Sequence, residues 1–328
     1  MIFPWQITQW QALFQAYQEK RLPHAVLLIG AAGIGKKQFA RAFAETILCR
    51  ELDKNGTPCG QCQPCGLTKA KTHPDLLIIE PEETGQMIKI DQIREVIHFA
   101  SETPQQGGYK IIIVTPANAM NIAAANALLK TLEEPVPNTL LLLTSDQSTR
   151  LPATIISRCQ KIIFQKPAPD AALSWLKTEG GLSESTADLS LLLNLAEGAP
   201  LKVKELLENG TLTLRDELYR GLINLSQKRA DPLELAAKWH EKDTRLLLTL
   251  LLSWLRDAIV SALTNNKADI IHSDYRDSFS QLKFSRQAIL LFLDEVQQAY
   301  ARITGSLNLN KQLLLEELLI RWHCVVGA

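Results

Sequence analysis

A run of glycines and lysines near the N-terminus has the residue types of a phosphate-binding loop. Gly30, Gly33, Gly35 and Lys36 stand between a short apolar run and a segment of helical pattern. In such a loop the glycines let backbone N–H groups converge on phosphate oxygens, and the lysine reaches the β- and γ-phosphates. The sequence therefore predicts either a site for a nucleotide such as ATP or a tight strand-to-helix turn that is kept for packing alone.

Two positions where ATP-hydrolysing loops place their magnesium ligands carry unsuitable residues. A Ser or Thr hydroxyl normally follows the loop lysine, and an Asp-Glu pair normally ends a later apolar strand. Here Lys37 stands at the first position, and Thr115 and Pro116 follow the apolar run that ends at Val114. An ammonium group repels magnesium, and neither Thr115 nor Pro116 can hold the metal or activate water. We therefore expect no ATP hydrolysis by this chain alone, whether or not a nucleotide still enters the loop.

Four cysteines follow the loop with the spacing of a metal site. Cys49 ends the helical segment after the loop, and Cys59, Cys62 and Cys65 form two consecutive CxxC steps. Four thiolates make the closed tetrahedral set that a structural Zn²⁺ prefers. An iron–sulfur cluster is the main alternative, although the fourth cysteine of the ferredoxin pattern would lie downstream and precede a proline. Free thiols are the third possibility. We expect zinc, with a role in stability.

Composition places the chain among ordinary globular proteins. Of its residues, 46% are hydrophobic and 21% are charged, which is typical of a globular protein. Its length of 328 residues indicates two or three domains. Basic and acidic residues number 35 each, so no bulk positive field is available to hold nucleic acid. Neither a signal peptide nor a membrane span is predicted, because the apolar runs reach only about five or six residues. We expect a cytoplasmic location, where cysteines are ligands or buried thiols; Cys159 and Cys324 are expected to be buried.

Short apolar runs alternate with helical patterns in the first half of the chain, as is typical of strands that are buried on both faces of a parallel sheet. Strands are expected at 25–29, 76–79, 110–114, 140–144 and 161–164, with helices at 36–49, 91–100 and 121–132. A proline-rich break at 166–169 follows. Beyond it only helical patterns occur: three short ones between 170 and 210, then longer ones near 212–227, 231–241, 244–264, 285–304 and 308–324. The sequence thus predicts an α/β domain followed by an all-α region.

Two further motifs give the first half a resemblance to a known family. Residues 126–135 read Asn-Ala-Leu-Leu-Lys-Thr-Leu-Glu-Glu-Pro, and Ser157-Arg158-Cys159 precedes the last expected strand. Together with the loop and the cysteines, these motifs resemble the clamp-loader branch of the AAA+ family over residues 24–165. The resemblance implies a P-loop AAA+ domain at 1–166 with a zinc knuckle inserted at 49–65. It also implies a small helical lid at 167–209 and a helical collar for oligomerisation at 210–328.

The same resemblance implies a role in loading a sliding clamp onto primed DNA during replication. The expected partners are other clamp-loader subunits, both motor ATPases and the clamp-opening subunit, together with the clamp and DNA that the complex binds; no membrane partner is expected. Some subunits of this branch have lost their ATPase residues, and Leu201 agrees with that pattern, since it stands where the ATPases carry the sensor 2 arginine. Arg158 would then act in trans as an arginine finger at a neighbour's ATP site.

Other interpretations of these residues stay open. Physical chemistry alone favours Arg158 as a cap on carbonyls at the C-terminus of a short helix. The chain could also be an active motor subunit, which Lys37, Thr115 and Pro116 disfavour, or a plain scaffold without any catalytic contribution. Thr144 and Ser145, at the end of an expected strand, occupy the sensor 1 position of the family and are expected to be vestigial. The helix at 126–135 is expected to bury an apolar stripe, and none of its residues is assigned a role.

Overall fold

The computed structural model describes residues 2–52, 56–83, 85–106, 108–146, 148–183, 185–263, 270–275, 285–304 and 310–327. The chain divides into two compact units. The first comprises Met1–Ala172 and Ala199–Leu201, and the second comprises Leu173–Gly198 and Lys202–Ala328. The continuous part of the first unit runs to Ala172, and the domain limit at 166 stays a prediction. The division of the helical region into a lid at 167–209 and a collar at 210–328 stays a prediction.

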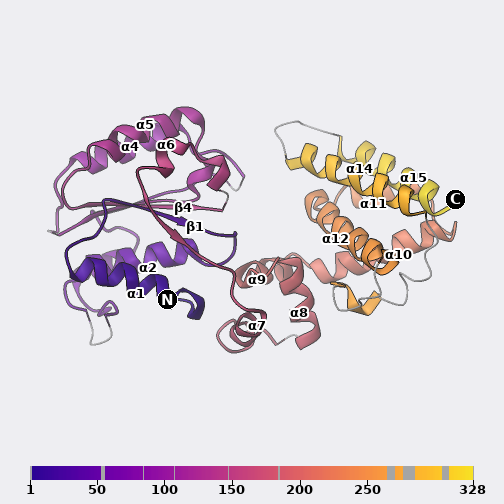
Figure 1. Cartoon of the computed structure of the whole chain (residues 1–328), viewed down its shortest axis with the longest axis horizontal. Helices are drawn as coiled ribbons and strands as arrows, with labels where there is room; N and C mark the ends of the chain where they lie inside the picture. The colour runs from indigo at the N-terminus through magenta and orange to yellow at the C-terminus, as the bar shows by residue number, and fades with distance from the viewer. Residues whose placement is uncertain are drawn as a thin grey trace. The chain divides into compact units, whose positions relative to one another are not determined.

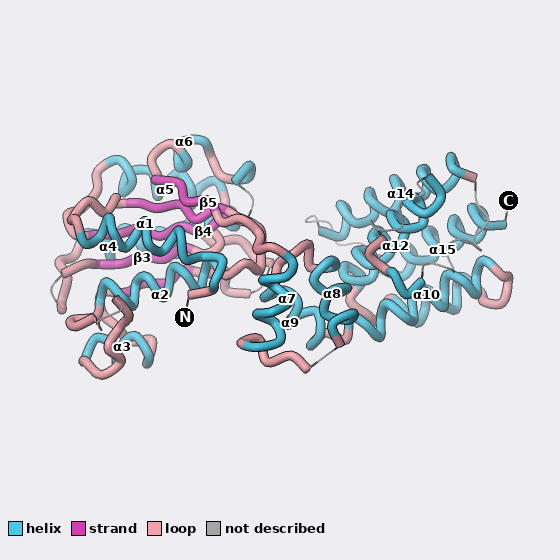
Figure 2. Tube along the Cα trace, turned by 60° about the horizontal axis from the view of Figure 1, so that its bottom comes forward, coloured by secondary structure: helices cyan, strands magenta, loops and turns pink. Residues whose placement is uncertain are grey.

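A five-stranded sheet in the order β2-β3-β4-β1-β5 forms the centre of the first unit (Figures 1 and 2). All its strand pairs are parallel, which confirms the predicted α/β class. The strands are β1 Ala25–Ile29, β2 Leu76–Ile79, β3 Lys110–Val114, β4 Thr139–Ser145 and β5 Gln160–Ile163. Strand β4 is one residue longer at each end than predicted. Strand β5 lies one residue earlier than predicted, although the Phe164 N–H still donates to the Ile29 oxygen at 2.7 Å.

Helices cover both faces of this sheet. Helices α1 and α2 lie on one face, and α4, α5 and α6 lie on the other (Figure 1). The predicted helices at 36–49, 91–100 and 121–132 correspond to α2, α4 and α5, whereas α1 and α3 were not predicted. The helices of this unit are η1 Pro4–Gln6, α1 Ile7–Gln18, α2 Lys36–Leu48, α3 Gln63–Lys69, α4 Ile90–Ser101, η2 Ala117–Ala119, α5 Ile122–Glu133, η3 Ser148–Arg150 and α6 Ala153–Ile156.

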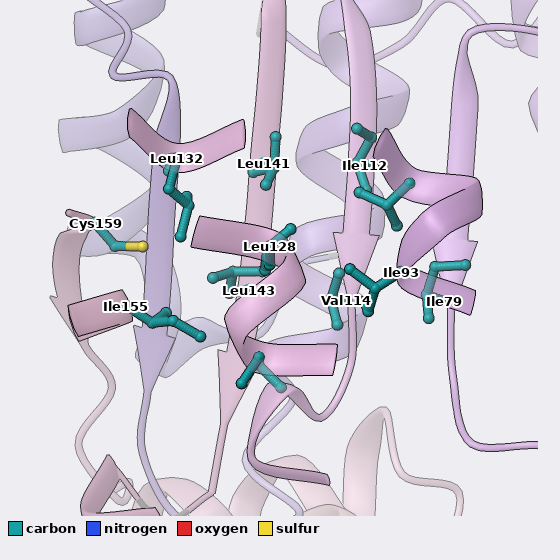
Figure 3. Close-up of a cluster of buried hydrophobic side chains, with 14 of the residues drawn as sticks. Ile79, Ile93, Ile112, Val114, Leu128, Leu132, Leu141, Leu143, Ile155 and Cys159 are labelled. Carbon is teal, nitrogen blue, oxygen red and sulfur yellow. The ribbon is translucent and has the colours of Figure 1, made fainter. Parts of the chain in front are cut away.

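Neighbouring residues of each central strand belong to two different hydrophobic cores. Leu27 and Leu141 pack among residues of α4 and α5 (Figure 3 draws part of this core), whereas Val26 and Leu142 pack among residues of α1 and α2. Successive side chains of a strand point to opposite faces, and here both faces are covered. This is why the strands read as continuous apolar runs rather than as alternating patterns.

The described elements of the second unit are all helical. The predicted segments at 212–227, 231–241, 244–264, 285–304 and 308–324 correspond to its last five α-helices; residues 264, 308 and 309 lie outside the described part. In the described residues no helix is both long and apolar enough to cross a membrane, and the cytoplasmic location stays a prediction. The helices that lie wholly or mainly in this unit are α7 Pro169–Thr178, α8 Thr186–Leu195, α9 Pro200–Glu208, α10 Thr211–Ser226, α11 Pro232–Trp239, α12 Thr244–Leu263, η5 Ser273–Tyr275, α14 Arg286–Thr304 and α15 Lys311–Gly327.

Two fully buried tryptophans join the helices of this unit. The rings of Trp254 on α12 and Trp322 on α15 meet edge to face, with centroids 5.4 Å apart. Trp322 Nε1 also donates to the backbone oxygen of Leu222 on α10 at 3.1 Å. The prediction that Cys324 is buried was wrong, because its side chain is exposed. Two residues after Trp322, it lies about 200° around the helix and so faces away from that core.

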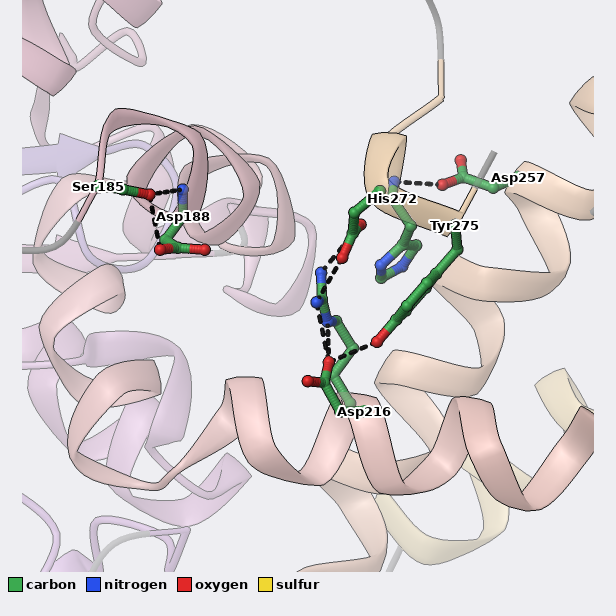
Figure 4. Close-up of polar contacts among 8 residues, drawn as sticks. Ser185, Asp188, Asp216, Asp257, His272 and Tyr275 are labelled. Carbon is green, nitrogen blue, oxygen red and sulfur yellow. Dashed lines mark hydrogen bonds and ion pairs between the residues drawn. The ribbon is translucent and has the colours of Figure 1, made fainter. Parts of the chain in front are cut away.

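A polar cluster fixes the short helix η5 against α10 and α12 (Figure 4). Arg215 Nη2 forms an ion pair with Asp274 Oδ2 at 2.7 Å. The backbone N–H of His272 donates to Asp257 Oδ2 at 2.6 Å. Burial raises the pKa of the Asp257 carboxyl, and the backbone hydrogen bond opposes that shift. The cluster therefore fixes residues 270–275 through the side chains of Arg215 on α10 and Asp257 on α12.

Candidate functional site

The phosphate-loop residues lie where β1 meets the N-terminus of α2. Gly33 and Gly35 adopt positive φ values of 78° and 92°, which residues with a side chain rarely adopt. A side chain on Gly30 would collide with the backbone oxygen of Phe164, which lies 2.5 Å from the position that its Cβ would take. The turn itself requires all three glycines, so their presence fits a packing turn as well as a nucleotide site.

Lys36, the residue that would reach a phosphate, is directed into its own loop. Its Nζ donates to the oxygens of Gly30 at 2.8 Å and Ala31 at 2.7 Å, and it pairs with Asp146 Oδ1 at 2.6 Å. These three contacts use all three ammonium hydrogens. Burial lowers the pKa of Lys36, and Asp146 opposes the shift. A phosphate group would have to displace some of these partners. The sequence analysis did not select Asp146.

The N-terminal segment closes over the same loop. Trp5 Nε1 and Gln6 Nε2 both donate to the Ile34 oxygen at 2.9 Å. A side chain on Gly35 would collide with the Phe3 ring, which stacks on the Trp5 ring with centroids 5.0 Å apart. The loop backbone is therefore held from outside by side chains that the sequence analysis did not select.

Two buried threonine hydroxyls lie at neighbouring strand ends, Thr115 where ATPases hold magnesium and Thr144 at the predicted sensor 1 position. Thr115 follows β3 and Thr144 is the second-last residue of β4, and their Oγ1 atoms are hydrogen-bonded at 2.7 Å. Lys37 pairs instead with Glu80, which follows β2, with 2.5 Å between Nζ and Oε1. The carboxylates of Glu80 and Asp146 are thus each paired with a lysine. Among these described groups, none is arranged like the magnesium ligands of an ATP-hydrolysing loop.

The segment 199–201, which belongs to the first unit, also contacts the loop. The Leu201 N–H donates to the Gly33 oxygen at 3.0 Å. Leu201 is the residue that the family resemblance placed at the sensor 2 position, and it does lie beside the loop. Its apolar side chain leaves this position without the cation that would stabilise phosphate charge.

The four predicted metal ligands come together between α2 and α3. Cys49 directly follows α2, and Cys62 directly precedes α3. Their Sγ atoms and those of Cys59 and Cys65 all lie within 4.8 Å of one another, with individual separations of 3.6, 3.9 and 4.0 Å. Four sulfurs bound tetrahedrally at about 2.3 Å from one ion would be about 3.8 Å apart. The four cysteines could therefore hold a single metal ion.

Backbone amides of this knuckle favour the thiolate form that a metal requires. The Cys59 N–H donates to Cys49 Sγ at 3.3 Å, and the Cys62 N–H donates to Cys59 Sγ at 3.4 Å. Burial raises the pKa of the Cys62 thiol, but hydrogen bonds from the backbone of Arg50 and Cys65 and with the neighbouring thiols of Cys65 and Cys59 lower the value to about 6. In the same cluster burial raises the pKa of Cys49 and of Cys65, and backbone hydrogen bonds oppose both shifts. Such bonds to ligating atoms orient a metal site and stabilise its charge.

Arg158 lies in the turn between α6 and β5, and 35% of its side chain is exposed. Its Nη1 donates to the Thr154 oxygen at 3.0 Å, and its Nη2 pairs with Glu133 Oε1 at 2.7 Å. The first contact is a helix-carbonyl cap of the kind that physical chemistry alone favours. Glu133 ends α5, and the sequence analysis assigned it no role. Cys159 is buried as predicted, and burial raises its pKa to about 11.

Sequence comparison relates both halves of the chain to DNA polymerase III. A family described as DNA polymerase III, delta subunit, matches residues 5–168, and the family of its C-terminal part matches residues 209–324. The DNA polymerase III subunit delta' of Pseudomonas aeruginosa is 36% identical over 99% of this chain and 98% of its own length. The delta' subunit of Escherichia coli is 30% identical over 97% of this chain and 94% of its own. A solved gamma subunit-related protein of Thermotoga maritima aligns over 95% of this chain and 99% of its own, at 19% identity and a TM-score of 0.46.

The chain has a parallel sheet with a phosphate loop, followed by an all-helical region. Both parts match families of a DNA polymerase III subunit. Together these features define an AAA+ clamp-loader subunit. The identities over nearly the whole chain narrow this class to one subunit type. The chain belongs to the delta' subunit family of the DNA polymerase III clamp loader. The resemblance to the clamp-loader branch of the AAA+ family, which the sequence motifs predicted, is therefore confirmed.

Proposed function

We propose that this chain is a non-hydrolysing subunit of the clamp loader that places Arg158 in the ATP site of a neighbouring subunit. It would act as a stator, holding a fixed position while ATP-driven subunits change state, and it would help to load the sliding clamp onto primed DNA. The observation that carries the proposal is that Thr115, whose hydroxyl is hydrogen-bonded to that of Thr144, stands where an ATPase carries the acidic pair that binds magnesium and orients water.

Three further residues support the proposed lack of hydrolysis at the chain's own loop. The Lys36 ammonium is already satisfied by two carbonyls and Asp146. Lys37 stands where a hydroxyl would bind magnesium, and its ammonium would repel the metal. Leu201 brings no cation to the loop. A bound ATP would therefore lack a metal ligand, a base and a second cation, the groups that position water and stabilise charge during phosphoryl transfer.

Arg158 is the group that such a subunit would contribute. Its Nε hydrogen and one Nη2 hydrogen make no hydrogen bond within the described part of the chain. These donors would spread positive charge onto the γ-phosphoryl oxygens of ATP in a neighbouring subunit. An arginine that acts in trans raises the hydrolysis rate by about 10³–10⁵-fold. One residue is therefore sufficient reason for a loader to keep a subunit without its own ATPase activity.

The proposed partners are the other clamp-loader subunits, with the sliding clamp and primed DNA reached through the complex. Equal numbers of basic and acidic residues, 35 each, support DNA contact through the assembly rather than through a bulk field of this chain. Leu291 on α14 and Leu313 on α15 are exposed apolar side chains, as expected if residues 210–328 form a collar that associates with its equivalents in a ring.

We propose Zn²⁺ as the metal of the knuckle, held by Cys49, Cys59, Cys62 and Cys65. The sulfur separations support one ion, because a four-iron cluster would bind each thiolate through a different iron and hold the sulfurs farther apart. Zinc would supply no reaction chemistry here, since four thiolates leave no open position for water or substrate. Its role would be to fasten the loop at 49–65 to the end of α2.

Disabling the loop and the arginine in turn tests the proposed function. Complete loaders would be assembled with Lys36→Met, which keeps most of the buried side-chain volume, or with Arg158→Ala, and assembly would be checked by light scattering. We expect DNA-stimulated ATP turnover to be unchanged with Lys36→Met, because this loop does not hydrolyse ATP, and to fall with Arg158→Ala.

Each rival function predicts a different outcome. Turnover that falls with Lys36→Met and not with Arg158→Ala would identify an active motor subunit. Turnover that stays at the wild-type level with both variants, in fully assembled loaders, would identify a plain scaffold.

A further inference from the structure

We infer that Glu133 is a positioning residue for Arg158: it would hold the guanidinium in the orientation from which its free hydrogens reach the neighbour's phosphate. This inference rests on the proposed function. It also gives a role to the end of the 126–135 motif, for which the sequence analysis found none.

The contacts of Arg158 define one orientation of its planar side chain. Nη2 pairs with Glu133 Oε1 at 2.7 Å, while Nη1 donates to the Thr154 oxygen at 3.0 Å and to Ser157 Oγ at 3.4 Å. Thr154 and Ser157 lie within a few residues of Arg158, so they can move together with its turn. Glu133 is the partner that fixes the guanidinium relative to a different part of the fold.

The buried side of the same two segments explains why Glu133 and Arg158 meet. Leu132 and Cys159, their immediate neighbours in sequence, are both buried in the core that also contains Ile155 of α6 (Figure 3). Since this shared core packs the end of α5 against the turn after α6, the adjacent residues Glu133 and Arg158 come within ion-pair distance on the outer side. His24 secures the helix end further, with its Nε2 3.2 Å from the Leu132 oxygen.

The exposure of the pair indicates orientation rather than stability as its main effect. The side chains of Arg158 and Glu133 are 35% and 49% exposed, and pairs that are this accessible to water add little to folding stability. A free arginine side chain has many rotamers, however, and a catalytic cation acts best when its geometry is fixed before the charge develops. Glu133 bonds only one edge of the guanidinium, so the Nε hydrogen stays free for the phosphate.

Removing Glu133 should therefore slow hydrolysis at the neighbour's site without weakening ATP binding there. Glu133→Ala is expected to lower kcat by about two- to fivefold, the effect of losing an exposed ion pair of ordinary strength, with KM for ATP unchanged. Glu133→Gln, which keeps an acceptor oxygen at the same place, should give a smaller fall. Glu134→Ala is the matched control, because Glu134 is the exposed neighbour in sequence, and it should leave kcat unchanged.

A double-mutant cycle in the complete loader decides whether Glu133 acts through Arg158. The expected result is that Glu133→Ala lowers the rate in the wild-type background and has no further effect when Arg158 is already alanine. An equal fall in both backgrounds, an unchanged rate, or a faster rate with Glu133→Ala would overturn the inference while leaving the proposed function intact. If Arg158→Ala by itself leaves the rate unchanged, the proposed function fails and this inference fails with it.

Discussion

Replacing Arg158 by alanine is expected to lower ATP hydrolysis at the neighbouring subunit's site by about 10³-fold or more, as for other arginines that act in trans. The guanidinium would stabilise charge that develops on the γ-phosphoryl oxygens as the bond to the leaving group breaks, so the loss should appear in kcat rather than in KM for ATP. The fold should tolerate the change, because the side chain is partly exposed and the Thr154 carbonyl that it leaves lies at the surface.

Two further variants make this prediction specific to a guanidinium. Arg158→Lys keeps the positive charge but loses the planar fork, so it should recover little of the lost rate. Arg150→Ala removes another exposed arginine from the segment that leads into α6, and it should leave the rate unchanged. Single-turnover hydrolysis by quenched flow, in loaders of verified composition, measures each effect. A wild-type rate with Arg158→Ala would show that the residue only caps its helix.

Loss of the knuckle's metal is the second change with a large expected effect. Structural zinc sites of small domains contribute about 10–16 kcal/mol of apparent binding free energy at neutral pH. Cys62→Ser is therefore expected to reduce bound zinc from about one ion per chain to nearly none and to lower the melting temperature. Since the four ligands lie between α2 and α3, proteolysis should then cut first within residues 49–65, while the sheet, which buries its own core, persists.

Metal analysis and thermal melting of the purified chain measure these effects, and Cys324→Ser is the matched control. Cys324 is exposed and lies outside the knuckle, so its replacement should change neither the zinc content nor the melting temperature. Full zinc retention by the Cys62→Ser chain would contradict the four-cysteine site. Iron with visible absorption in the wild-type chain would contradict the choice of metal.

The sheet and the metal ligands are the parts of this protein that the sequence predicts best. Each central strand is covered on both faces, so its residues are nearly all apolar and its limits are visible in the sequence. The CxxC spacing similarly brings Cys59, Cys62 and Cys65 together by local turns alone. The degenerate ATPase positions Lys37 and Thr115 could be identified because the loop and the strand ends fix their places in any fold of this class.

Contacts between distant segments could not be predicted in the same way. Asp146, the ion-pair partner of Lys36, lies 110 residues away from it, and no local pattern connects the two. Glu133 meets Arg158 only because Leu132 and Cys159 share a core. Local apolar character also misled the assignment of Cys324. It lies within the leucine-rich helix α15, but its angular position on that helix turns it away from the buried Trp322.

The central claim is our proposal that the described residues around the phosphate loop offer no group arranged to hold magnesium or activate water, and that any contribution to ATP hydrolysis comes from Arg158 acting on another subunit. Magnesium-dependent phosphate release by the purified chain alone tests this claim most directly. We expect no release from ATP above the protein-free blank, with or without primed DNA, because Thr115 and Thr144 offer only a neutral hydroxyl pair. Sustained release that requires magnesium and disappears with Lys36→Met would contradict it.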